Sequence, residues 1–346
     1  MSTSTYADLG IPASSATVSV KAFNVVDEPN TVIVPAGVFL SPVLPQRVMF
    51  DLGPREDLTK TAEVIAEAVK AGVVAMPVSR DIGTQLKETG VELDSINAVI
   101  WSHAHFDHIG DMHKFPPSVD LVFGDAMVTD LADPKTQLQE SDMAGRTLVP
   151  LNFASSQLEL CGFRSLDFFG DGSLYLLDVP GHLDGHICAL ARVTPTTFVL
   201  LAGDACFHPG LLRPTADLPS LYPYPEGLVA RTRASISASH FPTTDSLGEG
   251  KFDLTTRTTP LLDIAESGYF EDPPLARAAI RKMEKFDANA DVFVVQGHDE
   301  SLMSVVGALP RTLDGWKASG WKEKHMWAFL EEENPAFRFN VVEAAA

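Results

Sequence analysis

The sequence predicts a mixed α/β fold that carries a metal site at one edge of its sheets. Short apolar runs, typical of buried strands, alternate with stretches of helical periodicity. Strands that end at one edge bring the residues after them together, and a rigid scaffold with functional residues on its loops is a common way to build a site. Four apolar runs each end two or three residues before a side chain that can bind a metal ion: they close at Trp101, Val179, Leu201 and Val295, before His103, His182, Asp204 and His298.

The first 120 residues are expected to begin with an arm and to continue as strands and helices. Residues 1–16 are polar and rich in small side chains, which predicts a flexible arm. The helical segments show apolar residues at helical spacing and end at Gly72 and Gly90. In chain order, the expected elements are strands over 17–26, 31–34 and 47–50, helices over 58–69 and 81–88, and a buried strand over 98–101.

The rest of the chain is expected to complete a single domain over residues 17–346. Residues 207–275 are rich in proline and aromatic side chains, which predicts a long irregular insertion that serves as a binding loop or lid. Three tryptophans after Pro310 indicate a tail that docks on the body as a helix. The expected elements are strands over 121–123, 173–179, 187–193, 197–202 and 291–295, a helical turn over 125–131, and helices over 227–237 and 274–286.

Composition limits the kind of partner. The net charge of −20, from 46 acidic and 26 basic residues, repels a phosphate backbone. It argues against nucleic acid and for a small neutral substrate, although solubility alone explains the acidity equally well. No apolar run has the length of a membrane span, and residues 1–16 lack the basic and apolar parts of a secretion signal, so we expect a cytoplasmic protein. Three cysteines without paired spacing predict free thiols.

The densest chemical signal is the segment Ser102 to Gly110, in which three imidazoles and a carboxylate fall within six positions. In an extended segment His103 and His105 point the same way, so they can bind one cation together. Asp107 and His108 are adjacent and can face a second position once the chain turns. Imidazole with carboxylate suits zinc and is tolerated by manganese and iron.

Four motifs in this order resemble the metallo-β-lactamase superfamily of dinuclear hydrolases: His103-Ala104-His105-Phe106-Asp107-His108, Pro180-Gly181-His182, Gly203-Asp204 and Gly297-His298. The resemblance implies an αββα sandwich, in which two mixed β-sheets are flanked by helices. It also implies two divalent ions, with zinc favoured over Mn²⁺ or Fe²⁺. By the same resemblance, His186 is a structural residue, and the ligands are His103, His105 and His182 for the first ion, Asp107, His108 and His298 for the second, and Asp204 as the bridge.

Details of the motifs favour one branch of the superfamily. Asp204 stands where secreted β-lactamases usually place cysteine, and this resembles the glyoxalase II and lactonase branch. His105 stands where the oxygen-reducing diiron branch has glutamate. The sequence departs from the family pattern twice: Asp111 replaces the second glycine after the cluster, and Phe207 replaces a tyrosine common in lactonases.

The resemblance implies attack on a carbonyl group by a hydroxide that bridges the ions. Asp107 is the candidate catalytic residue, because it lies near that hydroxide and can pass a proton to the leaving group. Ordinary packing is the alternative role for each candidate substrate-binding residue. These candidates are Phe106, Phe207, His208, Tyr222 and Tyr224, whereas His113, His240 and His325 have no partner motif and are expected to be structural.

We therefore expect a hydrolase that opens a cyclic ester or cyclic amide, which makes it a lactonase or lactamase. A thioesterase of glyoxalase II type is the first alternative. A phosphodiesterase or nuclease is disfavoured by the acidic charge, and a non-catalytic binding protein would be expected to lack ligands. The sequence leaves open the substrate ring, the ion used in the cell and whether the chain forms homo-oligomers.

Overall fold

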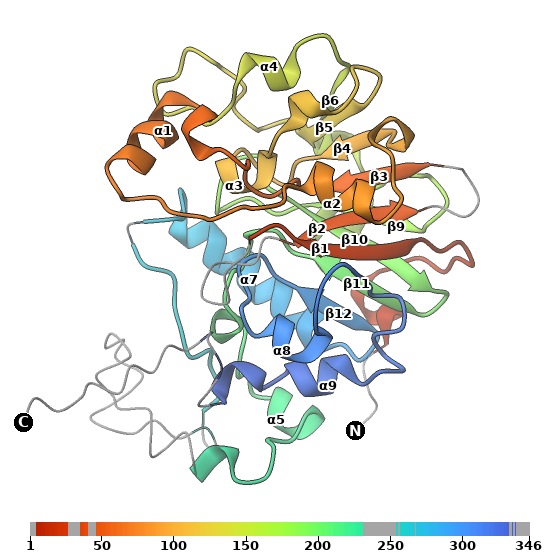
Figure 1. Ribbon diagram of the computed structural model, residues 1–346. Helices are drawn as coiled ribbons and strands as arrows, with labels where there is room; N and C mark the ends of the chain where they lie inside the picture. The colour runs from red at the N-terminus through yellow and green to blue at the C-terminus, as the bar shows by residue number, and fades with distance from the viewer. Residues whose placement is uncertain are drawn as a thin grey trace, which may run out of the picture.

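The structure is a computed structural model, and it describes residues 5–26, 35–40, 46–230, 254, 257–266, 268–331, 334 and 336. Two mixed β-sheets form its centre, with four parallel pairings among otherwise antiparallel strands. The first sheet has 7 strands in the order β13-β1-β2-β3-β4-β5-β6 and the second has 6 in the order β12-β11-β10-β9-β8-β7. Helices lie on both outer sides of this pair of sheets (Figure 1).

The bounds of the elements follow the chain. The first sheet comprises β1 (Ser19–Asn24), β2 (Pro35–Leu40), β3 (Arg47–Phe50), β4 (Ala98–Ile100), β5 (Asp120–Gly124), β6 (Leu148–Leu151) and β13 (Arg311–Thr312). The second comprises β7 (Glu159–Leu160), β8 (Phe163–Asp167), β9 (Leu174–Asp178), β10 (Ile187–Thr194), β11 (Thr197–Leu201) and β12 (Val292–Val295). The α-helices are α1 (Glu63–Lys70), α2 (Ile82–Glu88), α3 (Phe106–Ile109), α4 (Glu140–Met143), α5 (Leu218–Leu221), α7 (Pro273–Ala288), α8 (Leu302–Val306) and α9 (Trp321–His325).

Alternation along the strands explains the layers. In β4, Ile100 belongs to the cluster between the two sheets, whereas Val99 belongs to the cluster beneath α2. In β11, Leu201 faces the space between the sheets and Leu200 faces α7. Because side chains of a strand point alternately to its two faces, each of these strands is apolar on both sides. The result is the predicted αββα sandwich.

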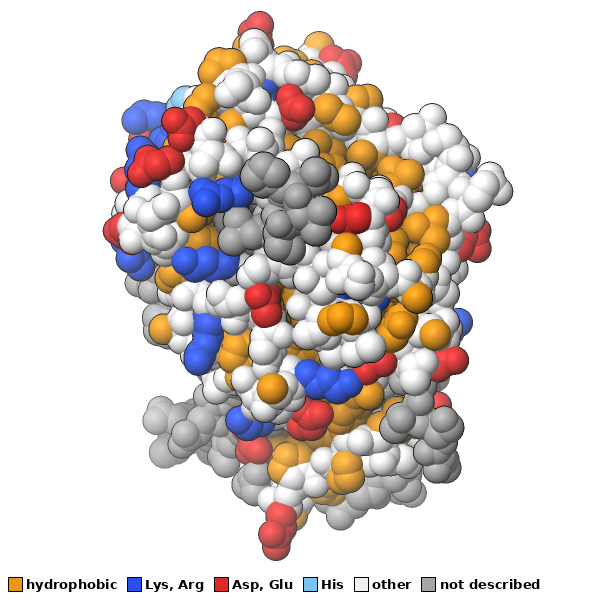
Figure 2. Space-filling model, turned by 90° about the vertical axis from the view of Figure 1, so that its right-hand side faces the viewer, with side chains coloured by type: hydrophobic (Ala, Val, Ile, Leu, Met, Phe, Trp, Pro, Cys, Tyr) orange, Lys and Arg blue, Asp and Glu red, His pale blue; other side chains and the backbone are white. Residues whose placement is uncertain are grey.

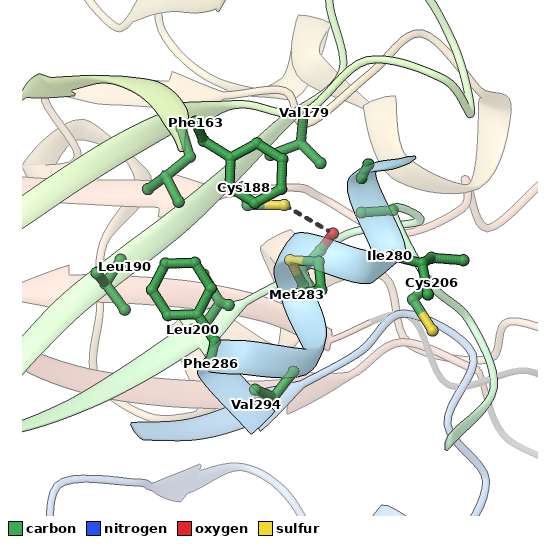
Figure 3. Close-up of a cluster of buried hydrophobic side chains, with 14 of the residues drawn as sticks. Phe163, Val179, Cys188, Leu190, Leu200, Cys206, Ile280, Met283, Phe286 and Val294 are labelled. Atoms are coloured by element: carbon green, nitrogen blue, oxygen red, sulfur yellow. Dashed lines mark hydrogen bonds between the residues drawn. The ribbon is translucent and has the colours of Figure 1, made fainter. Parts of the chain in front are cut away.

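Helix α7 covers the outer face of the second sheet (Figure 3). Its side chains Ile280, Met283 and Phe286 are buried against strand residues such as Leu200 and Val294. The spacing of three residues keeps these side chains on one face of the helix. The Asp272 side chain caps the start of the helix by accepting a hydrogen bond from the Leu275 backbone N–H, at 2.9 Å. Observed bounds lie within two residues of the predicted 274–286.

Several predicted elements differ from the structure. The expected helix over 58–69 is split into a 3₁₀ turn at Leu58–Lys60 and α1, and 125–131 contains turns instead of a helical segment. The predicted strand 31–34 lies outside the described residues, as does most of the predicted helix 227–237. The tail contains α9 and a 3₁₀ turn at Ala328–Leu330 instead of one helix. As expected, its tryptophans Trp316, Trp321 and Trp327 are buried.

The amino-terminal arm also differs from the prediction of a flexible segment over 1–16. From Thr5 on it is described, and Leu9 and Ile11 are buried in the cluster beneath α7. The Tyr6 ring packs on Phe198, with their ring centroids 5.5 Å apart. Three apolar side chains thus hold a segment whose composition is otherwise polar.

On the face shown in Figure 2, Lys and Arg side chains are interspersed with Asp and Glu. Among the described residues, no helix combines the length and the apolar character that a bilayer span requires. The three cysteines are free thiols, two of them buried.

Candidate metal centre

The four strand ends singled out in the sequence meet at one edge of the sandwich. The segment after β4 in the first sheet carries His103, and the loops after β9, β11 and β12 in the second sheet carry His182, Asp204 and His298. All seven predicted ligands fall into two groups in which one donor atom per residue lies within 4.8 Å of the others. The first group is His103, His105, His182 and Asp204, and the second is Asp107, His108 and His298.

Three imidazoles of the first group form a tight triangle. His105 Nδ1 lies 3.0 Å from His103 Nε2 and 3.0 Å from His182 Nε2, and the two Nε2 atoms are 3.1 Å apart. Nitrogen ligands about 2.0–2.1 Å from a tetrahedral zinc ion are roughly 3.3 Å from one another. The triangle therefore matches three corners of a zinc coordination sphere, and the nitrogens come from two different sheets.

The second group is more open and contains a carboxylate. Asp107 Oδ2 lies 4.0 Å from His108 Nε2 and 3.5 Å from His298 Nε2. Asp204 reaches this group as well as the first: its Oδ1 is 3.2 Å from His108 Nε2 and its Oδ2 is 3.0 Å from His298 Nε2. The same Oδ2 is 3.5 Å from His182 Nε2. Asp204 thus stands between the two groups, where a bridging ligand must stand.

Some of the donor atoms lack the hydrogen-bond partners that buried polar atoms normally have, and this favours a bound ion. Asp204 Oδ1 and His108 Nε2 are buried, yet neither makes an aligned hydrogen bond within the described structure. Buried polar atoms are nearly always satisfied, so unsatisfied ones that point at a common centre indicate a ligand. Imidazole nitrogens and carboxylate oxygens are the donor set that zinc prefers.

Burial keeps the first group neutral. It lowers the pKa of His103 and His182 well below the usual histidine value, and it lowers the pKa of His105 in the same direction. Burial also brings the pKa of the neighbouring His186 to about 4. Neutral imidazoles keep the lone pair that a metal ion needs.

Charge pairing determines the direction of the pKa shifts in the second group. Burial alone would lower the pKa of His108, but the carboxylates of Asp204 and Asp51 raise it well above its usual value. The pKa of His298 is likewise raised, against the effect of burial, chiefly by Asp204. For Asp204 burial acts to raise the pKa, and the adjacent His108 and His298 hold it well below the usual carboxyl value. Asp204 is therefore an anion, as a bridging ligand must be.

Asp51 supports the centre from behind, although it belongs to none of the predicted motifs. It follows β3, is 1% exposed and has a positive φ of 54°. Its Oδ2 lies 2.8 Å from His108 Nδ1, and its two oxygens accept hydrogen bonds from the Ser102 N–H and the Ser102 hydroxyl group, both at 2.7 Å. A carboxylate behind a ligating imidazole fixes its orientation and directs its other nitrogen to the metal. The apolar run 47–50 before Asp51 was the available signal.

His186 has the structural role that the family resemblance implied. Its Nε2 accepts a hydrogen bond from the Asp204 N–H at 3.0 Å, and its Nδ1 is 3.1 Å from the Val179 carbonyl oxygen. His186 therefore holds the backbone of Asp204 and contributes no atom to either group of donors.

Two backbone features bring His298 and Asp204 close together. His298 has a positive φ of 60°, which is unusual for a residue with a side chain. At Gly297 an added Cβ would lie 2.3 Å from Asp204 Oδ1, so only glycine fits beside the carboxylate. Next to His298, the buried Asp299 pairs with His325 at 2.6 Å and fixes the loop. His325 is thus structural, as expected.

Asp111, one of the two residues that depart from the family pattern, forms ion pairs. It pairs with the buried Arg55 at 3.3 Å and with Lys114 at 3.0 Å. Arg55 also contacts the buried Asp142 of α4. These ion pairs hold the segment that follows α3, and α3 carries Asp107 and His108.

Only some of the predicted substrate-binding residues lie beside the metal centre. Phe207 lies beside the centre, with its ring centroid 6.2 Å from those of both His182 and His298. Phe106 begins α3 and donates its backbone N–H to the Gln137 side chain at 2.8 Å. The described contacts of His208 lead elsewhere: its Nδ1 accepts from the Gly210 N–H, and its Nε2 faces the Ala336 carbonyl oxygen.

Tyr222 and Tyr224 belong to a separate apolar cluster formed with the carboxyl-terminal segment. The Tyr224 ring lies 4.4 Å from the ring of Trp327, and its hydroxyl group donates to the Leu254 carbonyl oxygen at 3.1 Å. Tyr222 is 8% exposed, and its carbonyl oxygen accepts from the Trp327 indole N–H at 2.8 Å. These contacts indicate packing rather than a position against the seven ligands.

Comparison with known proteins agrees with this geometry. The family model for the metallo-beta-lactamase superfamily matches residues 46–298. The chain is 36% identical to the metallo-hydrolase mfmC of Annulohypoxylon moriforme, over 95% of this chain and 90% of that protein. It is 34% identical to the gamma-lactamase FDB1 of Fusarium pseudograminearum, over 83% of this chain and 70% of that protein. A crystal structure of a quorum-quenching N-acyl homoserine lactone lactonase superimposes with a TM-score of 0.53 at 15% identity, covering 86% of this chain and 99% of that one.

The fold and the cluster of histidine and aspartate donors define a metallohydrolase sandwich. The chain belongs to the metallo-β-lactamase superfamily. This membership confirms the predicted family, the predicted fold and the predicted class of enzyme, a hydrolase.

Proposed function

We propose that this protein opens the ring of a small neutral cyclic amide or cyclic ester with the help of two divalent ions. The observation that carries the proposal is the convergence of all seven donor residues in two groups with Asp204 between them. The 34% identity to a gamma-lactamase over most of the chain supports a cyclic amide as substrate.

In this proposal each group of donors holds one ion. His103, His105 and His182 hold the first, and their all-nitrogen triangle favours zinc. Asp107, His108 and His298 hold the second, and Asp204 binds both. Such ions, when bound, polarise a carbonyl group and lower the pKa of water towards neutrality.

Asp107 has the position to handle the proton of the leaving group. It is 6% exposed and lies at the start of α3, with Oδ2 facing His298 Nε2. An oxygen held there can take a proton and return it to the departing amine or alcohol. Phe207 lies beside both groups and offers an apolar surface to the rest of the ring. We further propose that the described part of the stretch 207–275 that includes Phe207 and Tyr269 forms one side of the substrate site, as a loop of the single domain over residues 17–346; residues 231–253, 255, 256 and 267 lie outside the described structure.

The remaining alternatives keep the fold and change the substrate. A thioesterase of glyoxalase II type acting on an anionic thiol conjugate would benefit from a basic rim, whereas the chain has a net charge of −20. A phosphodiesterase faces the same repulsion.

A substrate panel tests the proposal. Purified protein, loaded with zinc or with manganese, is assayed on a γ-lactam, a homoserine lactone, a thioester and a phosphodiester. We expect hydrolysis of the lactam or the lactone, and its loss in Asp107→Asn. Hydrolysis of only the thioester or only the phosphodiester would overturn the proposed substrate class. Glu67→Gln, on the exposed side of α1, is the matched control and should retain full activity.

A further inference from the structure

A cavity of about 340 Å³ opens beside the metal centre. This volume lies in the range of small-molecule sites. One of the lining residues is His105, whose Nδ1 belongs to the tight triangle of the first group. Ala104 lines the cavity beside His105, and the rest of the wall comes from three loops: residues 127–137 after β5, the loop after β9 with Leu183 and Asp184, and residues 268–271 before α7. A substrate at the centre can therefore extend into this cavity.

Exposed apolar side chains gather at the mouth of the cavity. Tyr269 is 79% exposed and Val128 is 57% exposed, and both line it together with Leu183 and the buried Met127. Large apolar side chains are seldom left this exposed in clusters unless the surface binds something.

Three aromatic rings, those of Phe207, Tyr269 and Phe270, form a continuous surface beside the metal centre, which we call the aromatic shelf. The Tyr269 ring lies 6.1 Å from Phe207, edge to face, and Phe270 stacks on Phe207 at 5.0 Å. The Phe270 ring is itself 5.3 Å from the ring of His182. The shelf thus runs from a proposed metal ligand to the mouth of the cavity.

The backbone that carries Tyr269 is tied to the loop that carries His182. The Glu271 N–H donates to the His182 carbonyl oxygen at 3.1 Å, and the Asp272 N–H donates to the Gly181 carbonyl oxygen at 3.0 Å. The Glu271 carboxylate accepts from the Asp184 N–H at 3.3 Å. Although the Tyr269 side chain is exposed, its backbone has a defined place relative to the centre.

The charge of the lining selects against anions. Three carboxylates, those of Asp133, Asp184 and Glu271, face one ammonium group, that of Lys135. A substituent that bears a carboxylate or a phosphate would meet net repulsion there.

We propose that this cavity binds a neutral aromatic substituent of the ring substrate, and that Tyr269 packs on that substituent as a specificity-determining residue. The inference rests on the proposed function and narrows its substrate class to lactams or lactones that carry or are fused to an aryl group. Tyr269 supplies contact area, and it does not touch the bond that breaks.

Paired substrates test the role of Tyr269. The assay compares γ-phenyl-γ-butyrolactone with γ-butyrolactone, and 5-phenyl-2-pyrrolidinone with 2-pyrrolidinone. Tyr269→Ala should raise KM for the phenyl compound roughly tenfold, because stacking and apolar burial are lost. Its kcat/KM for the plain ring should stay within about twofold, since the plain ring does not reach the cavity. Tyr269→Phe should behave as the wild type.

The control is Val73→Ala, which truncates a side chain that is 78% exposed and lies just after α1, away from the cavity lining. It should leave both substrates unchanged. An equal loss on phenyl and plain rings in Tyr269→Ala, or no loss on either, would overturn the proposal. Equal damage by Tyr269→Phe and Tyr269→Ala would overturn the role of the ring.

A second arm tests the charge of the lining. Asp184→Lys should lower the ratio of KM for a ring bearing a carboxyphenyl group to KM for the phenyl ring severalfold. An unchanged ratio of the two KM values would contradict selection by charge.

Calorimetry separates failure of this inference from failure of the proposed function. If the wild-type protein opens none of these rings, the proposed function is overturned. Binding of the phenyl lactam to the metal-loaded protein, weakened roughly tenfold in Tyr269→Ala, would still support the cavity. Equal binding by the wild type and Tyr269→Ala would overturn it.

Discussion

The two halves of the metal centre are built differently. In the first half three imidazole nitrogens lie within 3.1 Å of one another, and burial keeps them neutral. In the second half Asp107 lies 3.5 Å and 4.0 Å from the nearest imidazole nitrogens, and charge pairing with carboxylates raises the pKa of His108. The first half is already shaped for an ion, whereas the donors of the second must close around one.

This difference implies unequal affinity for the two ions. Donors that are already converged lose less freedom on binding, and nitrogen donors favour zinc over harder ions. We therefore expect the first position to fill before the second and the second to accept a wider range of metals. Asp204 couples the two positions, because its carboxylate reaches both.

Removal of Asp204 should have the largest effect, because it takes the shared ligand from both halves. We expect Asp204→Ala to lose at least one ion per chain and to lower kcat/KM at least roughly a thousandfold. Elemental analysis and ring-opening kinetics are the measurements. Full activity in this variant would show that no bridging carboxylate is needed.

Variants that lack one ligand test the unequal affinity of the two positions for metal ions directly. His182→Ala breaks the tight triangle, so we expect weak binding of the ion that otherwise fills first. His298→Ala should remove only the ion of the second position and leave one tightly bound zinc. Zinc titration followed by calorimetry distinguishes the two variants, and identical titration curves would contradict the comparison.

Asp51→Ala should act mainly on the second half, because Asp51 contacts His108 directly and reaches His103 only through the Ser102 hydroxyl group, which lies 2.9 Å from His103 Nδ1. The variant leaves His108 Nδ1 without its carboxylate, and loss of such a support typically weakens metal binding 10- to 100-fold. We expect that loss at the second position and a smaller loss at the first, measured by the same titration. A loss of metal binding confined to the first position would contradict the support of His108 by Asp51.

The folding stability of the metal-free protein should depend on pH through the histidines of both halves. A lowered pKa, as in His103 and His182, means that these groups resist protonation in the folded state, so stability falls as the pH drops below the unfolded value of about 6.5. A raised pKa, as in His108 and His298, gives stability that is fully present below about 6.5 and is lost as the pH rises through the folded values. In the presence of a chelator, the thermal unfolding temperature should therefore be highest near pH 6.5. A steady rise in stability from pH 5 to 9 would contradict the raised values.

The donors were predictable from the sequence because each follows an apolar run that ends at the same edge. Asp51 also follows an apolar run, over residues 47–50, but a lone aspartate after a short strand resembles an ordinary turn. Only the parallel pairing of β3 with β4, with Phe50 opposite Ile100, places it behind His108. That pairing joins segments 50 residues apart, and no local pattern reveals it.

The proline-rich stretch was hardest to predict for the same reason. Its residues lack periodicity, and distant partners decide where they pack. Trp327 of the tail fixes Tyr222 and Tyr224 in a separate cluster. Tyr269, which the sequence did not single out, takes a place at the cavity because its backbone is tied to the His182 loop. The composition of an arm or a loop thus says little about a few decisive contacts.

The number of ions bound per chain is the most direct test of the centre. Protein stripped with a chelator and reloaded with zinc should bind two ions, the first more tightly than the second, with ring-opening activity that follows the second. Full activity with one ion per chain, or none, would contradict a centre built from two unequal halves around Asp204.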